Sequence, residues 1–123
     1  MTDTKILVVD DVASMRNVTK SILMVAEYPN VTLATDGVDA LEILQGKTFD
    51  LIICDWEMPN MDGLQLLMEI KKTEQHKNIP FLMLTSNTEK VKVNVALKNG
   101  ADDYVIKPIQ PSELIEKIKK CLE

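Results

Sequence analysis

Residues 50–63 read DLIICDWEMPNMDG, an apolar run that ends on acidic residues and a proline. The segment Leu51–Cys54 is uncharged and apolar and contains two β-branched isoleucines, as in a strand that is buried on both faces of a sheet. Asp55 follows directly, and Glu57 and Pro59 come close behind it. Because an unpaired charge is costly to bury, Asp55 must meet water, a cation or a counter-charge at the end of this strand.

Four further runs have the same character as the one that ends at Asp55. They are Lys5–Val9, Val31–Ala34, Pro80–Leu84 and Tyr104–Ile106. Each of the five runs is followed by a longer segment in which apolar residues recur at helical spacing. Asp36 and Asp62 stand where helices should begin, and Asp is a favourable N-cap. Gly46 and Gly100 stand where helices should end. The sequence therefore predicts five strands that alternate with five helices.

The segment after the fourth strand is ambiguous. Val91, Val93 and Val95 alternate with polar residues, which is typical of a strand. We predict a helix over 88–99, because this stretch is longer than most strands and is followed by Gly100. The residues expected to face the core are Met15, Val18, Ile22 and Ala26 in the first helix, and Leu64, Leu67, Met68 and Lys71 in the third.

Strict alternation of strands and helices predicts the fold class. It favours an α/β protein with a parallel sheet, helices on both faces and right-handed crossovers. The simplest arrangement is a flavodoxin-like, doubly wound (βα)5 sandwich with strand order 2-1-3-4-5, formed by one domain over residues 1–123. Ligands of such sheets bind outside the carboxyl ends of the strands where the order reverses, which here is between strands one and three.

Composition excludes several functional classes for this chain. The 123 residues are 46% hydrophobic, which is typical of a globular domain with a sizeable core. The net charge of −5 argues against a nucleic-acid-binding surface, which requires a basic patch. No apolar run approaches the length that spans a bilayer, and no secretory signal opens the chain. We therefore expect a monomeric cytoplasmic protein that contacts neither membrane nor nucleic acid.

Two residue types that often form sites have little support here. Cys54 and Cys121 lie far apart and form no CxxC pair, so we expect two reduced thiols that behave as small apolar residues. His76 lies in the polar segment 72–78. This setting predicts an exposed histidine that is neither a ligand nor a base.

Chemically active side chains follow four of the predicted strands. They are Asp10 and Asp11, Asp55, Thr85 with Ser86, and Lys107. In the order 2-1-3-4-5, these strand ends are neighbours at one edge of the sheet. Taken singly, each residue could be a helix cap, an exposed strand end or a surface lysine. The convergence of all four on one edge favours a functional site.

Three carboxylates this close predict a bound cation or a protonated carboxyl. At about 4 Å and an effective dielectric constant near 20, each pair repels by roughly 4 kcal/mol. Oxygen ligands without His or Cys favour Mg²⁺. Such a site suits phosphoryl transfer, with Asp55 as the nucleophile and with Lys107 and Thr85 bound to phosphoryl oxygens.

The ordered motifs resemble the receiver domain of two-component response regulators. The motifs are Val8–Asp11, Asp55–Gly63, Thr85-Ser86 and Tyr104–Pro108, and the likeness covers nearly the whole chain. Within the family, they are most similar to the single-domain chemotaxis regulators. The resemblance implies that Asp55 is the phosphoacceptor and that Lys107 contacts the acids or the phosphate. It also implies that Asp11, Asp55 and the backbone carbonyl of Glu57 bind Mg²⁺, with Asp10 acting through water.

The resemblance further implies a switch and a set of partners. Thr85 would move toward the phosphoryl group, Tyr104 would fill the vacated space, and the face of the fourth helix, fifth strand and fifth helix would change. The partners would be a histidine kinase of the chemotaxis type, a flagellar motor switch protein or another downstream protein, and a phosphatase. The chain would catalyse only its own phosphorylation and dephosphorylation, so it would not be an enzyme. Lys117, Lys119 and Lys120 form a basic stripe that is either a solvated face or part of the docking surface.

Four alternatives remain open. FMN binding would require a Ser-, Thr- or Gly-rich phosphate loop after the first strand, where this chain has Asp10 and Asp11. A phosphatase with an aspartyl nucleophile would use an Asp-x-Asp pattern, which here reads Asp55-Trp56-Glu57 without an inserted cap domain. A degenerate receiver would lack part of the acid, Thr and Lys set. A phosphorelay intermediate would pass the phosphoryl group on to a second histidine.

Glu57 is the residue at which the chain departs from the chemotaxis regulators, which commonly carry Asn there. Only its backbone carbonyl is implied in metal binding, so the side chain is free to act on the site. It could pair with Lys107, help to hold the cation or repel the phosphate. We predict that Glu57 sets the lifetime of the phosphorylated state.

Overall fold

The computed structural model of the chain describes residues 3–86 and 90–123. Strands and helices alternate throughout, as the sequence predicts. The strands are β1 (Ile6–Val9), β2 (Val31–Ala34), β3 (Leu51–Asp55), β4 (Phe81–Thr85) and β5 (Asp103–Ile106). The helices are α1 (Ala13–Val25), α2 (Gly37–Leu44), α3 (Gly63–Lys71), α4 (Lys90–Lys98) and α5 (Pro111–Cys121).

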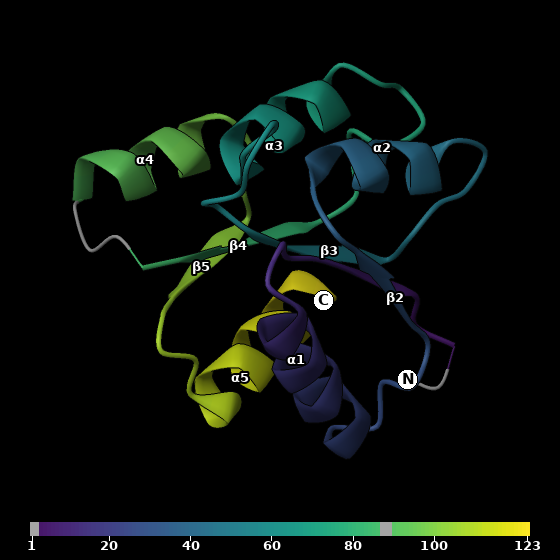
Figure 1. The fold of residues 1–123 in the computed structure, drawn as a ribbon, viewed down its shortest axis with the longest axis vertical. Coiled ribbons are helices and arrows are strands. Elements are labelled where there is room, and N and C mark those ends of the chain that lie inside the picture. The colour runs from purple at the N-terminus through teal and green to yellow at the C-terminus, as the bar shows by residue number, and fades with distance from the viewer. Residues whose placement is uncertain (1–2, 87–89) are drawn as a thin grey trace.

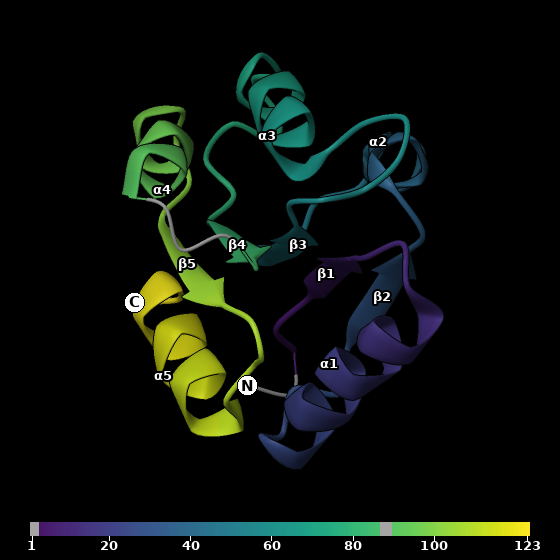
Figure 2. The same ribbon diagram turned by 60° about the vertical axis from the view of Figure 1, so that its left-hand side comes forward.

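The strands form one parallel sheet between two layers of helices. The order is β2-β1-β3-β4-β5, which confirms the predicted flavodoxin-like arrangement. Helices α2, α3 and α4 cover one face, and α1 and α5 cover the other (Figure 1). The turned view separates the same two layers (Figure 2). Because all strands are parallel, their carboxyl ends lie at one edge of the sheet.

Each face of the sheet has its own apolar core. Leu7, Ile52, Phe81 and Met83 belong to the cluster beneath α2, α3 and α4, and Ile6, Ile53, Leu82 and Val105 belong to the cluster beneath α1 and α5. Strands β1, β3 and β4 are buried along their whole length. This burial on both faces explains why these runs are continuously apolar rather than alternating.

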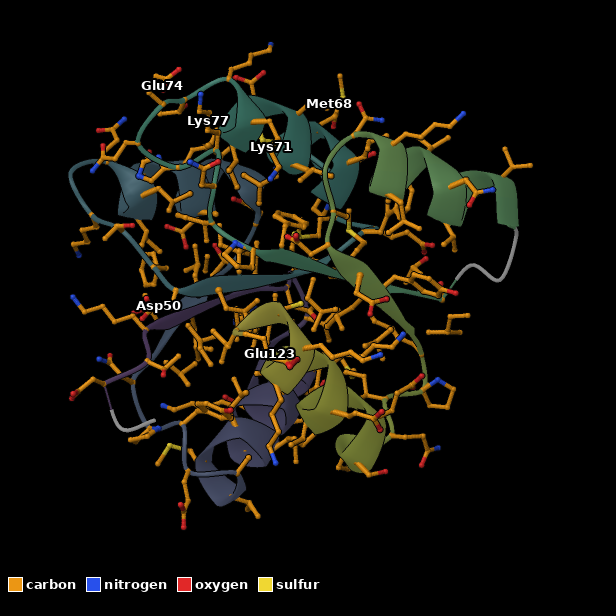
Figure 3. All side chains as sticks on the ribbon, turned by 180° about the vertical axis from the view of Figure 1, so that it is seen from behind. Asp50, Met68, Lys71, Glu74, Lys77 and Glu123 are labelled. Atoms are coloured by element: carbon orange, nitrogen blue, oxygen red, sulfur yellow. The ribbon has the colours of Figure 1, made fainter. Side chains whose placement is uncertain are left out.

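The helices bury faces that differ in part from the predicted ones. In α1 the fully buried residues are Thr19 and Leu23, and Val18 is exposed. In α3, Leu66, Leu67 and Ile70 are buried, whereas Met68 is exposed (Figure 3). The sequence prediction placed each stripe slightly around the helix from its observed position, and in α1 it did not expect a fully buried threonine.

The ambiguous segment is a helix where the structure describes it. Helix α4 spans Lys90–Lys98, and the start predicted at Thr88 lies outside the described residues. Val93 and Ala96 are buried three positions apart, whereas Val91 and Val95 are exposed. The alternation of valines is therefore not a strand pattern, since only one of the three reaches the core.

His76 is buried, so the prediction of an exposed histidine was wrong. Only 6% of the residue is accessible, and its Nε2 lies 2.7 Å from the carbonyl oxygen of Lys47. The contact joins the α3–β4 connection to the α2–β3 connection. The Lys71 ammonium also donates to the carbonyl oxygen of Lys77 at 2.9 Å, and both residues can be located in Figure 3. The polar segment 72–78 is thus held in place by hydrogen bonds between side chains and backbone carbonyls, which the sequence pattern does not indicate.

The cysteines are free thiols, as expected, with Cys54 buried and Cys121 partly buried. The Cys54 thiol donates to the carbonyl oxygen of Asp55 at 3.1 Å. Burial raises the pKa of Cys54 well above its ordinary value, so the thiol stays protonated. Within residues 3–86 and 90–123, no helix is both long and apolar enough to cross a membrane.

Candidate functional site: an acidic cluster at the carboxyl edge of the sheet

Three carboxylates from two neighbouring strands meet at the carboxyl edge. Asp10 and Asp11 follow β1, and Asp55 is the last residue of β3. One oxygen atom of each lies within 4.8 Å of the others. Asp10 and Asp55 are buried, whereas Asp11 is exposed. The structure thus brings together the acids that the sequence analysis placed at one edge.

Asp10 is held by two contacts and keeps one oxygen without a donor. Its Oδ1 accepts the Val12 N–H at 2.9 Å, and its carbonyl oxygen accepts from Arg16 Nη1 at 2.7 Å. Oδ2 is buried and has no hydrogen-bond partner among the described residues. Burial raises the pKa of Asp10, an effect that the Val12 N–H partly opposes. A buried carboxylate oxygen without a donor fits a hard cation such as Mg²⁺, which would offset the cost of desolvation.

Asp55 has a cation on its other side. Lys107 Nζ lies 2.8 Å from Asp55 Oδ1, and the two side chains are 21% and 6% accessible. Burial raises the pKa of Asp55, and the hydrogen bond and charge of Lys107 oppose that effect. Asp55 therefore lies between a lysine and two further acids.

Main-chain hydrogen bonds fix the strand ends that carry these groups. Trp56 N–H donates to the Leu84 carbonyl at 2.9 Å, and Lys107 N–H donates to the Thr85 carbonyl at 2.8 Å. Thr85 is buried at the end of β4, between the strands that carry Asp55 and Lys107. The three residues thus come from three adjacent strands and share one rim.

The turn from β3 into α3 requires glycine. Gly63 N–H donates to the Trp56 carbonyl at 2.7 Å, and a Cβ atom at Gly63 would lie 2.5 Å from the Asp55 carbonyl oxygen. The Asp62 carboxylate accepts the Gln65 N–H at 2.8 Å, and the Gln65 side chain accepts the Asp62 N–H at 2.9 Å. This capping box starts α3 directly against the end of β3. A larger residue at Gly63 would push on the backbone of Asp55.

Glu57 is exposed, and its side chain bonds across the rim. Glu57 Oε1 accepts from the Ser86 hydroxyl at 3.1 Å. Lys107 instead pairs with Asp55, so the Glu57–Lys107 pair that the sequence left open does not form in this structure. The bond to Ser86 links the β3–α3 connection to the end of β4.

Sequence reasoning missed two residues near the site and misjudged a third. Arg16 was not singled out, although its place one turn into the helix after Asp10 could have indicated a contact with that loop. Ser86 was noted only beside Thr85. Lys117, expected in a basic stripe, is partly buried and bonds to the Tyr104 carbonyl, whereas Lys119 and Lys120 are exposed. The Arg16 bond to Asp10 and the Lys117 bond to Tyr104 both end on backbone carbonyl oxygens, so no pattern of side chains encodes them.

Comparison with known proteins agrees with this geometry. Residues 6–119 match the response regulator receiver domain. The chain is 38% identical over 119 residues to the chemotaxis protein CheY of Pseudomonas aeruginosa, an alignment that covers 97% of this chain and 96% of that protein. The fold superposes on that of the chemotaxis response regulator CheY4 of Vibrio cholerae with a TM-score of 0.90 at 35% identity, covering 97% and 98% of the two chains.

A further similar structure bears on the acidic cluster. It is the receiver domain of a sensor histidine kinase from Pseudomonas aeruginosa, solved with a magnesium ion coordinated in its active site cleft. Its TM-score is 0.88 at 28% identity, and the match covers 97% of each chain. Receiver domains are signalling proteins rather than conventional enzymes, and they bind Mg²⁺ at an acidic pocket. With a family match over residues 6–119 and relatives identical at more than a third of their positions, this chain belongs to the response regulator receiver domain family.

Proposed function

We propose that the chain is a response regulator whose Asp55 accepts a phosphoryl group from a histidine kinase. The observation that carries the proposal is the position of Asp55, with Lys107 at 2.8 Å on one side and the carboxylates of Asp10 and Asp11 on the other. A carboxylate in this setting can act as a nucleophile, because positive charge is available for the oxygens of an incoming phosphoryl group. Residues 1–123 would form a single receiver domain.

The transfer uses groups that the rim already provides. An Asp55 oxygen forms the new bond to phosphorus while the bond from phosphorus to the donor histidine nitrogen breaks, and the imidazole leaves. Lys107 Nζ moves from the carboxylate to a phosphoryl oxygen, and the Thr85 hydroxyl donates to another. The chain would thereby catalyse its own phosphorylation and dephosphorylation and no other reaction.

Mg²⁺ fits the donor set of the site. The ligands would be Asp11, Asp55 and the backbone carbonyl of Glu57, with Asp10 acting through water. Bound there, the ion would neutralise charge on the transferring phosphoryl group. The buried Asp10 Oδ2, which lacks a donor among the described residues, supports a cation at this place. Arg16 holds the Asp10 carbonyl and so fixes the loop that presents both acids.

The signal would be a change of surface. Thr85 and Tyr104 are the proposed switch residues, because Thr85 lies beside the phosphorylation site and Tyr104 lies one strand further out. A Thr85 hydroxyl drawn toward the phosphoryl group would vacate space for the Tyr104 ring. The face formed by α4, β5 and α5 would then bind a downstream protein, as in a two-state element that one local charge event biases.

Similarity to chemotaxis proteins favours a flagellar motor switch protein as the partner, and a kinase and a phosphatase of the same pathway. A phosphorelay intermediate is the second candidate, because the same site can return its phosphoryl group to a histidine. An affinity capture that compares untreated protein with protein activated by beryllofluoride and Mg²⁺ separates the two. Enrichment of a motor protein favours chemotaxis, and enrichment of a histidine phosphotransfer protein favours the relay.

The phosphorylation itself can be tested without any partner. The protein is incubated with Mg²⁺ and acetyl phosphate, and its intact mass is measured. We expect a gain of one phosphoryl group that Asp55→Asn abolishes. A protein that gains no phosphoryl group would contradict the proposal. Steady turnover of unrelated phosphomonoesters would favour instead the phosphatase with an aspartyl nucleophile.

A further inference from the structure

Lys117 connects α5 to β5 through several contacts of its ammonium group. Its ammonium donates to the Tyr104 carbonyl oxygen and lies 3.4 Å from Asp103 Oδ1. It also lies 4.5 Å from the centroid of the Tyr104 ring and 3.9 Å from Glu113 Oε2. Only 21% of the lysine side chain is accessible. One ammonium thus contacts both the backbone and the ring of the same tyrosine.

These contacts cross the open edge of the sheet. Strand β5 is last in the sheet order, so in the part of the chain that the structure describes its outer edge has no neighbouring strand. Tyr104 packs against the core cluster on the α2–α4 face, whereas Val105 belongs to the cluster on the α1–α5 face. Lys117 comes from the α1–α5 layer and reaches around this edge to the tyrosine. The Tyr104 N–H is also taken by the Asp103 carboxylate at 2.8 Å, so side chains complete the backbone bonding of the edge strand.

We propose that Lys117 is a positioning residue that holds the Tyr104 ring in its present orientation. The proposal rests on the function proposed above, in which that ring changes place on phosphorylation. A cation over an aromatic face is attracted to it, and more strongly where the cation is partly shielded from water, as here. When the ring turns inward, the ammonium keeps the Tyr104 carbonyl and Asp103 but loses the ring. The contact therefore favours the unphosphorylated conformation.

Removal of the Lys117 charge should change the ratio between the two conformations of the Tyr104 ring. By linkage, a substitution that stabilises the conformation with the ring turned inward also raises the affinity for any ligand that binds this conformation more tightly. Loss of a partly shielded contact of this kind corresponds to a shift of about two- to fivefold in the ratio of the conformations. The affinity for beryllofluoride with Mg²⁺ should rise by the same factor, although Lys117 does not touch the acidic cluster.

Fluorine NMR can observe the ring directly. The chain has two tyrosines, so 3-fluorotyrosine labels Tyr104 and Tyr28, and the buried Tyr28 serves as an internal reference. Lys117→Met removes the charge and the donor, Lys117→Gln removes the charge and keeps a donor, and Lys117→Arg keeps both. Lys119→Met is the matched control, because Lys119 is exposed on the same helix.

Without beryllofluoride, we expect the Tyr104 resonance of the Met and Gln variants to lie closer to the position that it has in the wild type with beryllofluoride. Their half-saturating beryllofluoride concentration should fall about two- to fivefold, while Arg and Lys119→Met should behave as wild type. A Tyr104 resonance that does not move in the Gln variant would overturn the proposal. A shift of the Tyr28 resonance together with that of Tyr104 would also overturn it, because it would indicate a structural change throughout the domain. If beryllofluoride leaves the Tyr104 resonance of the wild type unchanged, whereas the Lys117 substitutions still shift it, the proposed switch is wrong and the positioning role of Lys117 stands.

Discussion

Lys107 and Asp55 form an ion pair that bridges two strands which are not neighbours. Asp55 ends β3 and Lys107 follows β5, with β4 between them, and Nζ lies 2.8 Å from Oδ1. The ion pair therefore passes over the end of β4, where Thr85 lies. A single side-chain contact thus joins the ends of β3 and β5 across the end of β4, and the proposed chemistry depends on all three strand ends.

Loss of this lysine should slow phosphorylation. In Lys107→Met, Asp55 keeps its burial but loses its nearest counter-charge, and the incoming phosphoryl oxygens lose a donor. We expect phosphorylation by acetyl phosphate to slow by roughly ten- to a hundredfold, the effect of losing one charge-assisted hydrogen bond. Intact-mass time courses measure it. Lys98→Met, a change at an exposed lysine of α4, should leave the rate unchanged, and an equal effect in both variants would contradict the role of Lys107.

The acidic cluster should reduce the stability of the metal-free protein at neutral pH. Burial raises the pKa of Asp10 and of Asp55 above the ordinary value of 3.8. The folded state therefore holds protons on these groups that the unfolded state has already released, so stability falls as the pH rises from about 3.8 through the raised values. Above that window, both carboxylates are charged at a cost to folding.

Asp10→Asn removes one of these charges. We expect it to raise the free energy of unfolding near pH 7 in the presence of a chelator, because the variant no longer buries a charge at this position. Mg²⁺ should stabilise the wild type more than the variant, since the variant has lost a group near the metal. Urea unfolding from pH 4 to pH 8 checks both points. Asp3→Asn, at an exposed carboxylate, is the control, and a variant no more stable than wild type would refute the electrostatic explanation.

His76 should matter for stability and not for phosphorylation. Its connection precedes β4 and so lies at the edge of the sheet opposite the acids. His76→Ala removes a buried ring and leaves the Lys47 carbonyl without its partner at 2.7 Å, so we expect a loss of about 2 kcal/mol. Thermal unfolding gives the loss, with the exposed Gln75→Ala as control. A slower reaction with acetyl phosphate at equal stability would show that the two edges are coupled.

A substitution at Thr19 should stabilise the fold, in contrast to the substitution at His76. Its hydroxyl is buried in α1 and has no hydrogen-bond partner among the described residues. Valine has a similar shape and does not bury a polar group, so Thr19→Val should raise the free energy of unfolding by about 1 kcal/mol. The same change at the exposed Thr48 should have little effect. A destabilised Thr19→Val protein would indicate that the hydroxyl does have a partner, such as a buried water molecule.

The fold could be predicted because its signals are local and repeated. Strands β1, β3 and β4 are nearly continuous apolar runs, Asp62 precedes a helix, and Gly100 follows one. Alternation of strands and helices then leaves few topologies. The site could be predicted in outline because parallel strands bring their carboxyl ends to one edge. His76 could not be assigned, since its partner is a backbone carbonyl from a different connection, and no side-chain pattern encodes that contact. The sequence shows Lys117 as one more surface charge, because its contacts with Tyr104 and Asp103 come from a different element, β5.

Glu57 remains the residue that should distinguish this chain from its relatives in the duration of its signal. Its carboxylate accepts from the Ser86 hydroxyl at 3.1 Å, lies two residues after the proposed phosphorylation site Asp55, and stays exposed. Glu57→Asn removes a negative charge near the phosphoryl group and the attacking water, and a charge in this partly screened position should alter the dephosphorylation rate constant by about two- to fivefold. Decay of phosphorylated protein after removal of acetyl phosphate measures it. Ser86→Ala keeps the charge but frees the side chain, so it separates the effect of charge from that of position. An unchanged rate in Glu57→Asn would show that the residue does not set the lifetime.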